Sequence, residues 1–394
     1  MRSLFLASLV ASLLLAALVD GSAVAAVLVP KSDDEVLEVL PTSLRAEERE
    51  IRALRSALAE QPEDVSRALD IAWRYVALGR RSGDPRYHGW AAGVARRWLE
   101  EPQPAAEVLM LRATLRQHRH EFRAALEDLS QLLARNPRDS RAWLARATLL
   151  QVQGEVQAAK ASCVPLLHTA HPLTATACLA RAGAASGNAA RSFEALSNAL
   201  AKAPEAEERL RRFALTSLAE IAVALGRESV AERSFREALA LRDPDSYTIA
   251  AFADFLLDRG RAAEVQELIP RDTRSDGLLL RRVLAGIELG EALAEIQARA
   301  LSARYAAARE RGVAADLGLQ ARFALEITGD PVRALELAQQ NFRKQREPRD
   351  VLILLESALA AGKRAEARPG LDFLRETGLE DQRLHRVAAA LGDA

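Results

Sequence analysis

The sequence predicts an all-α protein, an α-solenoid of stacked helix–turn–helix repeats. Hydrophobic residues make up 49% of the chain but aromatic residues only 5%, so the apolar surface comes mainly from Ala and Leu, both strong helix formers. Val, Ile, Thr and Tyr form no alternating runs of the kind that strands show. Glycines that interrupt helical patterns recur 30 to 39 residues apart, at Gly154, Gly187, Gly226, Gly260, Gly290, Gly329 and Gly362. Such a period is typical of helical repeat arrays.

The first 25 residues have the pattern of a secretory signal peptide. Arg2 precedes the apolar run "SLFLASLVASLLLAALV", and Ala23 and Ala25 stand as an A-x-A cleavage signal. An uncleaved membrane anchor is the alternative, although the run is near the lower length limit for a spanning helix. No second apolar run of spanning length follows. The mature protein is therefore expected not to insert into the membrane, and to be periplasmic or secreted from a bacterium.

Residues 26–42, "AVLVPKSDDEVLEVLPT", hold two prolines and an acidic cluster and predict an extended leader. A helix is expected over 43–62, because Ile51, Leu54 and Leu58 share one face and Pro62 marks its end. The repeat array is expected to fill the rest, 43–394, with about nine helix pairs. Prolines that are expected to end the second helix of one unit and to start the next unit lie at Pro137, Pro172, Pro204, Pro244 and Pro348.

The repeat units share a pattern of small residues, a turn glycine and a second-helix aromatic. The clearest unit, 214–244, has Ala219 on its first helix, then Gly226, and then Ala231 and Phe235 on its second helix. In the unit over 106–137, His120 stands where glycine is usual. This pattern resembles that of the tetratricopeptide repeat family, of a bacterial exported type. An alanine at the helix crossing lets the two axes approach, because a larger side chain would overpack. Equivalent crossing alanines are expected at Ala113, Ala147, Ala180, Ala219 and Ala253.

The family resemblance implies a right-handed superhelix whose first helices line a concave groove that binds peptides or protein segments. Carried over onto this sequence, the groove is expected to include residues of mixed character, with Arg and aromatic side chains of the kind that binding hot spots favour. They are Met110, Arg141, Arg181, Phe213, Glu220, Tyr247, Asp254 and Phe323. The Lys and Asn set with which some family members hold a carboxyl terminus is missing.

Both cysteines and two histidines, Cys163, His168, His171 and Cys178, fall within sixteen residues. Three interpretations stay open. The cysteines are small core residues, or they form a disulfide, which export would allow to persist, or the four residues form a metal site, although the spacing matches no familiar zinc pattern.

The sequence contains no motif of phosphate-binding, metalloprotease, redox or hydrolase active sites. Acidic and basic residues balance at 54 each, so no net charge favours nucleic acid as a partner. The predicted function is therefore an exported, non-enzymatic scaffold without cofactor or metal, which binds another protein or a peptide in its groove, within a cell-envelope assembly. The alternative is a structural subunit that docks through its leader, 26–42, or through its convex face.

Overall fold

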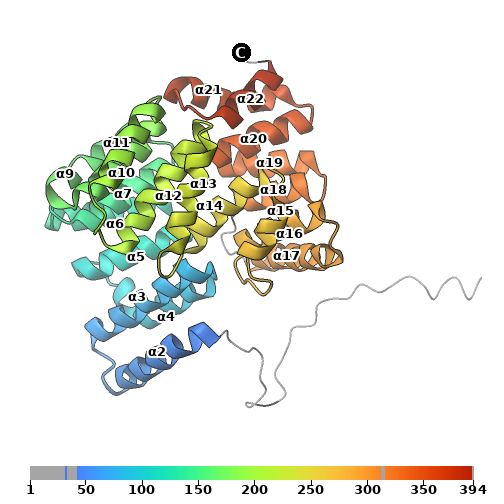
Figure 1. Cartoon of the computed structure of the whole chain (residues 1–394). Coiled ribbons are helices and arrows are strands. Elements are labelled where there is room, and N and C mark those ends of the chain that lie inside the picture. Colours follow the sequence, from blue (N-terminus) through green and yellow to red (C-terminus); the bar gives the residue numbers. More distant parts are fainter. Residues whose placement is uncertain (1–31, 33–41, 312–315, 393–394) are drawn as a thin grey trace, which may run out of the picture. The chain divides into compact units, whose positions relative to one another are not determined.

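The structure is a computed structural model, and it describes residue 32 and residues 42–311 and 316–392. The predicted signal peptide and, except for Ser32 and Thr42, the predicted leader lie outside these residues. The chain divides into two units, Met1–Ala53 and Leu54–Ala394. The described part of the first unit is mainly the start of one helix, α2 (Thr42–Glu60). The second unit, here called the array, contains the repeats (Figure 1).

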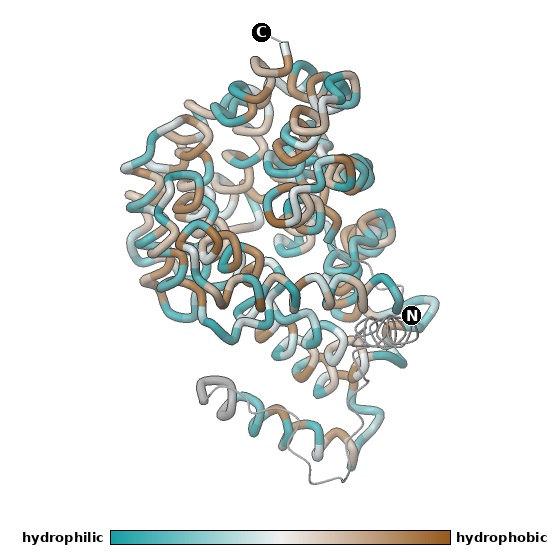
Figure 2. Tube along the Cα trace, turned by 90° about the vertical axis from the view of Figure 1, so that its right-hand side faces the viewer, coloured by the Kyte–Doolittle hydropathy of each residue, from teal (hydrophilic) through white to brown (hydrophobic). Residues whose placement is uncertain are grey.

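Helices in the described part of the array follow one another in pairs, and no strand occurs there, as the sequence predicts. Figure 2 shows hydrophobic and hydrophilic stretches alternating along these helices, as expected where each helix buries one face. The pairs, in chain order, are α3 (Val65–Ser82) with α4 (Arg86–Leu99), α5 (Ala106–His118) with α6 (Phe122–Arg135), α7 (Ser140–Val152) with α8 (Val156–Cys163), α10 (Pro172–Ala184) with α11 (Ala189–Ala201), α12 (Glu208–Ala224) with α13 (Glu228–Ala240), α14 (Ser246–Leu257) with α15 (Ala262–Leu268), α16 (Asp276–Glu288) with α17 (Ala292–Glu310), α18 (Leu317–Glu326) with α19 (Pro331–Phe342), and α20 (Pro348–Ala360) with the 3₁₀ turn η1 (Arg364–Ala367) and α21 (Arg368–Thr377). Two further helices are α9 (Leu166–Thr169), which follows α8, and the terminal α22 (Gln382–Leu391).

The predicted crossing alanines and turn glycines are confirmed. Ala113, Ala147, Ala180, Ala219 and Ala253 are all buried, with 0 to 3% exposure. The seven predicted glycines have φ between +63° and +77°, a left-handed conformation that ends the first helix of each pair. His120 also has a positive φ, of 58°. The backbone therefore keeps the left-handed turn where the sequence lacks the glycine.

Two of the predicted prolines stand at the start of a repeat. Pro172 and Pro348 are the first residues of α10 and α20. Proline is favoured at this position because the first turn of a helix has no partner for its N–H groups. These two prolines therefore start the next repeat, as predicted, and they do so from inside its first helix.

The two cysteines form a disulfide in the structure. Cys163 ends α8 and Cys178 lies on α10, with their Cα atoms 5.7 Å apart. Both side chains are buried in a small core cluster with Ala147 and Leu166. His168 and His171 are exposed instead, and His171 Nδ1 accepts a hydrogen bond from the N–H of Leu173 at the start of α10. The disulfide thus joins two consecutive repeats.

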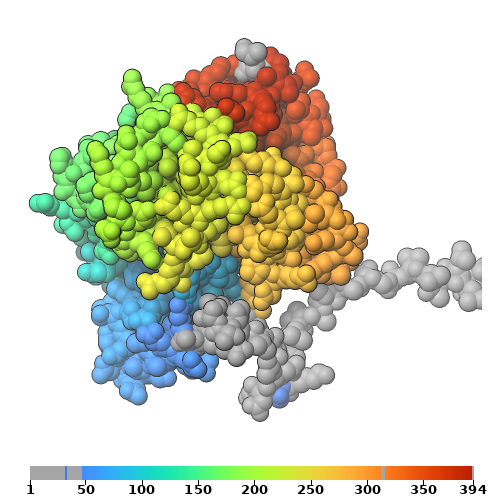
Figure 3. Space-filling view, viewed as in Figure 1, coloured from blue at the N-terminus to red at the C-terminus, as the bar shows by residue number. Residues whose placement is uncertain are grey.

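The last repeats of the array contact its middle repeats. Arg346 N–H donates to the carbonyl of Val152 (2.7 Å), and Ala189 N–H donates to Glu380 (3.1 Å). A Cβ atom on Gly187 would lie 3.2 Å from the carbonyl oxygen of Gly378. In Figure 3 the C-terminal helices, in red, lie against the green and yellow middle of the chain. The array therefore closes on itself, across contacts between residues far apart in the sequence.

Reduction of the disulfide should lower the stability of the array. The bond closes a loop of 15 residues, and loops of this size stabilise by about 2–4 kcal/mol, chiefly by restricting the unfolded chain. Reductant is expected to lower the melting temperature of the natural protein and to leave that of the Cys163→Ala/Cys178→Ala variant unchanged. An equal effect of reductant on both proteins would contradict this account.

Gly187→Ala should destabilise the array more than Gly329→Ala does. Both glycines have a positive φ, so both substitutions bear the same backbone penalty of about 1 kcal/mol. Only Gly187 packs against another backbone, whereas the space around Gly329 is open. Urea denaturation measures the difference, and amide exchange of α22 should accelerate in the first variant only. Equal destabilisation by the two variants would show that the Gly187–Gly378 contact contributes nothing.

Candidate protein-binding cavity

A cavity of about 460 Å³ lies inside the closed part of the array. Residues of α7, α10, α12 and α14 line one side, and residues of α18, α20 and the segments before α20 and α22 line the other. These helices are mostly the first helices of their pairs, as the family resemblance implies for a groove. The volume falls in the range of pockets that bury a ligand of drug-like size, and apolar side chains such as Ile221, Ile353 and Leu379 contribute to its wall.

Four of the eight predicted groove residues line this cavity: Arg181, Glu220, Tyr247 and Asp254. The other four lie elsewhere. Met110 packs against the core between α5 and α6, and Arg141 is exposed beside Asp139. Phe213 packs against the central core.

Phe323 was expected in the groove, but it lies in the core, 8% exposed, in an edge-to-face contact with Tyr305 of α17. The turn after α18 explains this. In the other six predicted glycine turns, the residue after glycine donates its N–H to the carbonyl four residues before the glycine, as Arg227 does to Ala222. After α18 the corresponding bond runs from Asp330 to Ala324, five residues before Gly329. The extra residue rotates α18, so that Arg322 faces the cavity in place of Phe323.

Arg181, Glu220 and Tyr247 form a connected group on three successive first helices. Arg181 Nη1 lies 2.7 Å from Glu220 Oε2, and the Tyr247 hydroxyl donates to Glu220 Oε1. Tyr247 is still 50% exposed inside the array. Desolvation of the hydroxyl, and then the negative charge of Glu220, raise the pKa of Tyr247 well above 10. At neutral pH the phenol therefore keeps its proton and presents a half-exposed aromatic ring in the cavity.

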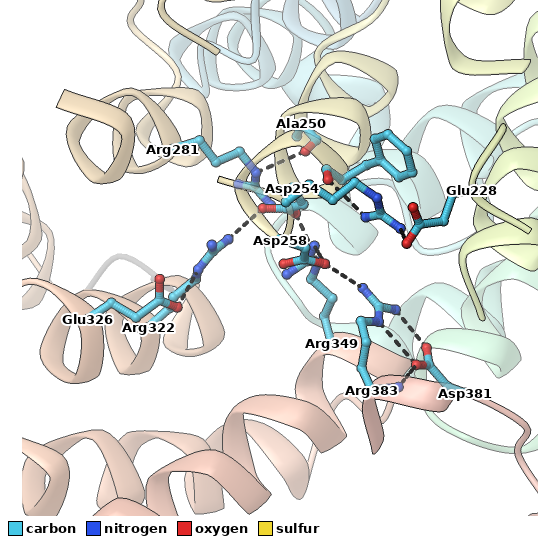
Figure 4. A network of polar contacts seen from close by, with 12 residues as sticks. Glu228, Ala250, Asp254, Asp258, Arg281, Arg322, Glu326, Arg349, Asp381 and Arg383 are labelled. Carbon is cyan, nitrogen blue, oxygen red and sulfur yellow. Dashed lines mark hydrogen bonds and ion pairs between the residues drawn. The ribbon is translucent and has the colours of Figure 1, made fainter. Parts of the chain in front are cut away.

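Asp254 is the centre of a larger network, drawn in Figure 4. Its carboxylate lies 2.6 Å from Arg281 Nη2 of α16, 2.6 Å from Arg322 Nη1 of α18 and 2.9 Å from Arg349 Nε of α20. Burial alone would raise the pKa of Asp254, but the three guanidinium groups outweigh it and hold that pKa well below its usual value. Asp254 therefore stays ionised although it is only 2% exposed.

The network continues outward to three further carboxylates. Glu326 lies 2.7 Å from Arg322, and Asp258 lies 3.7 Å from Arg349 and 3.4 Å from Arg383 of α22. Arg383 in turn lies 2.6 Å from Asp381. Each of the four arginines, Arg281, Arg322, Arg349 and Arg383, is thus paired, and four carboxylates, Asp254, Asp258, Glu326 and Asp381, balance them.

A second cavity, of about 440 Å³, lies next to the first between α14, α16, α18 and α20. The two cavities share five lining residues, Arg322, Glu326, Arg349, Leu352 and Glu356. The concave side of the array therefore offers two adjoining spaces, and the network of Asp254 lies where they meet.

Sequence reasoning missed Arg281, Arg322, Arg349 and Glu356. A signal for one of them was present in the register of the turns. Arg181, Glu220 and Asp254 each stand six residues before a turn glycine, and Glu356 stands six residues before Gly362. The arginines carry no comparable signal, because arginine is frequent throughout the chain.

Comparisons with known proteins identify solved structures only. No family model matches the chain, and no curated protein sequence matches it. A tetratricopeptide repeat protein from Parabacteroides merdae ATCC 43184 is similar at 15% identity over 73% of this chain and 98% of that one, with a TM-score of 0.32. PilW, described as a widely conserved type IV pilus biogenesis factor, is similar at 15% identity over 72% and 97%, with a TM-score of 0.30. The Cut9–Hcn1 structure of the APC/C is similar at 12% identity over 89% and 92%, with a TM-score of 0.40.

The chain's own features define its fold. Paired helices, buried crossing alanines and left-handed turns make the described part of the array an α-solenoid of tetratricopeptide-like repeats. None of the described helices is both long and apolar enough to cross a membrane. No three His, Cys, Asp or Glu side chains among the described residues are grouped so that they could hold a metal ion.

Asp254→Asn should destabilise the array strongly. Removing the charge leaves three arginines of the interior without their shared partner, which costs about 3–5 kcal/mol of unfolding free energy for a buried pair. Glu336→Gln, which breaks an exposed pair with Arg333, should change stability by less than about 0.5 kcal/mol. Urea denaturation at pH 7 measures both changes.

The effect of Asp254→Asn should also depend on pH. Because folding lowers the pKa of Asp254, its stabilising contribution is complete above the ordinary pKa of an aspartate, about 4, and is lost as the pH falls below that value. The difference between the natural protein and the variant should therefore shrink in acid. A difference that stays constant from pH 7 to pH 3 would show that the charge of Asp254 is not what stabilises the array.

Proposed function

We propose that the chain is an exported, non-enzymatic scaffold that binds a segment of another protein in its concave cavity. The observation that carries this proposal is the cavity itself. Side chains from seven repeats converge on one space of about 460 Å³, with apolar walls and polar groups held in fixed positions by ion pairs. Preorganised polar groups favour binding, because little side-chain entropy remains to be lost.

Tyr247 is the side chain best placed to contact a bound segment. It lines the cavity and is half exposed, while its hydroxyl is fixed by Glu220. Tyrosines of this kind are frequent among binding hot spots, since they supply a large contact area at low entropic cost.

The proposal includes export of the protein, which the N-terminal segment supports. The apolar run of residues 3–19 and the A-x-A pattern after it support export, and an exported scaffold would act in a cell-envelope assembly.

A second candidate is a structural subunit that docks through an outer surface. Around the turn between α16 and α17, the side chains of Leu289, Leu293 and Ile296 are 36 to 56% exposed. Clustered exposed apolar side chains often mark interaction sites. This surface does not depend on Tyr247, so the two candidates can be separated by mutation.

Tyr247→Ala should weaken partner binding by at least about tenfold, the loss typical of an aromatic hot spot. The experiment places a photo-crosslinking amino acid at position 247, at 296 or at 90 in the full chain, expressed in its native compartment. Trp90 is a matched control, because it is an aromatic residue of similar exposure (42%) outside the cavity lining.

A partner crosslinked from position 247, and lost in Tyr247→Ala but not in Trp90→Ala, supports binding in the cavity. Crosslinks from position 296 that survive Tyr247→Ala would move the site to the outer surface. Equal crosslinking from all three positions would contradict both candidates.

A further inference from the structure

Glu356 lies at the junction of the two cavities and lines both of them. It is carried by α20 at the position six residues before the turn glycine that Arg181, Glu220 and Asp254 occupy in their own repeats. Its side chain is partly exposed, as is expected for a residue in the wall of an open space. Glu356 is therefore accessible from either cavity.

The charges around Glu356 are already satisfied by one another. The charged groups near its carboxylate are Asp258 of α14, Arg322 and Glu326 of α18, and Arg349 of α20, and Glu288 of α16 lines the second cavity. Both arginines are engaged by Asp254, and each also pairs with a second carboxylate. No guanidinium group in this network is left to neutralise Glu356.

Among the described residues, Glu356 makes no hydrogen bond and no ion pair, in contrast to its paired neighbours. Its surroundings penalise an unpaired charge. Burial, and then the negative charge of Glu326, raise the pKa of Glu356 to about 7, against the opposing influence of Arg322 and Arg349. An entering cation would reverse this penalty, because it would supply the missing counter-charge where little water is present.

We propose that the junction of the two cavities binds the cationic group of a lysine or arginine side chain in a protein segment, with Glu356 as its anionic partner. The proposal rests on the proposed function and specifies the chemistry of the segment. The charge balance excludes the opposite choice, since an anionic segment would find every arginine of the network already paired. It also disfavours a purely apolar segment, which would bury Glu356 without a partner at a cost in free energy.

Binding of the cation should be linked to proton release. Below about pH 7 Glu356 is largely protonated and must lose its proton to pair with the cation, whereas above that value it is already ionised. The affinity for a cationic segment should therefore rise from pH 6 to pH 8 and level off above. A neutral segment should show no such dependence.

The test uses the full chain after export and three synthetic peptides, acetylated and amidated at their ends. The peptides are Ala-Leu-Ala-X-Ala-Leu-Ala, in which X is lysine, glutamine or glutamate, and binding is followed by fluorescence anisotropy at pH 8. We expect the lysine peptide to bind at least about tenfold more tightly than the glutamine peptide, as for a hydrogen-bonded ion pair. The glutamate peptide should bind most weakly.

Two variants show whether Glu356 itself is responsible. Glu356→Gln keeps the shape of the protonated side chain, so it should fold normally and abolish the preference for lysine. Glu288→Gln removes an exposed carboxylate from the second cavity alone, so it should change the preference by less than about twofold. Equal losses in the two variants would mean general attraction to an acidic surface and would overturn the proposal.

The remaining outcomes are also decisive. Equal binding of the lysine and glutamine peptides overturns the cation site while leaving peptide binding in the cavity intact. In a parallel titration, n-butylammonium should lower the pKa of Glu356, followed by carboxyl carbon NMR in glutamate-labelled protein, and butyrate should not. A response to n-butylammonium without binding of any peptide would assign the junction to a free amine rather than a protein segment, and would likewise overturn the proposal.

Discussion

The carboxylate of Asp254 is the contact on which the shape of the array's interior depends. It forms ion pairs with arginines of α16, α18 and α20, which belong to the three repeats that follow its own. Helix pairs in a solenoid ordinarily contact only their neighbours. A single acceptor shared by three later repeats instead holds four first helices around one point. The curvature of this half of the array is therefore set by a polar group inside it as well as by the packing of alanines between helices.

This arrangement has an electrostatic cost that the network itself offsets. Burying an unpaired carboxylate would cost free energy. Three arginines around one carboxylate would in turn leave excess positive charge. Asp258 and Glu326 supply negative charge to Arg349 and Arg322, and Asp381 pairs with Arg383, the fourth arginine of the network. The network is thus balanced within itself and fixes its arginines in place, so none of its guanidinium groups is left to pair with Glu356.

The fold could be predicted from the sequence because its signals are local. In four of the pairs an alanine stands seven residues before the turn glycine, and these two residues and the helical pattern on either side define the pair without reference to the others. The left-handed turn at His120 shows that the pattern of neighbouring helices determines the backbone even where the residue is unfavourable. The closure of the array was not predictable in this way, since Gly187 and Gly378 carry no sign of each other in the sequence.

Half of the residues predicted for the groove line the candidate cavity. Arg181, Glu220 and Asp254 follow the regular register, so a family pattern carried over residue by residue places them on the first helices that line the cavity. Phe323 stands at the same distance from its glycine, yet the extra residue in the turn after α18 rotates it into the core and brings Arg322 forward. A one-residue change in hydrogen bonding within a turn is invisible to pattern matching, but it changes which side chain faces the cavity.

The contact between the backbones of Gly187 and Gly378 also bears on how the chain folds. Solenoids generally have low contact order, so their repeats can form from any starting point and fray from either end. Here a segment near the end of the chain must meet one 191 residues earlier before the interior is complete. Closing so long a loop costs conformational entropy before the contact contributes any stabilising free energy. Assembly of the last repeats should thus be the slow step, and once formed they should open together with the middle of the array rather than by fraying.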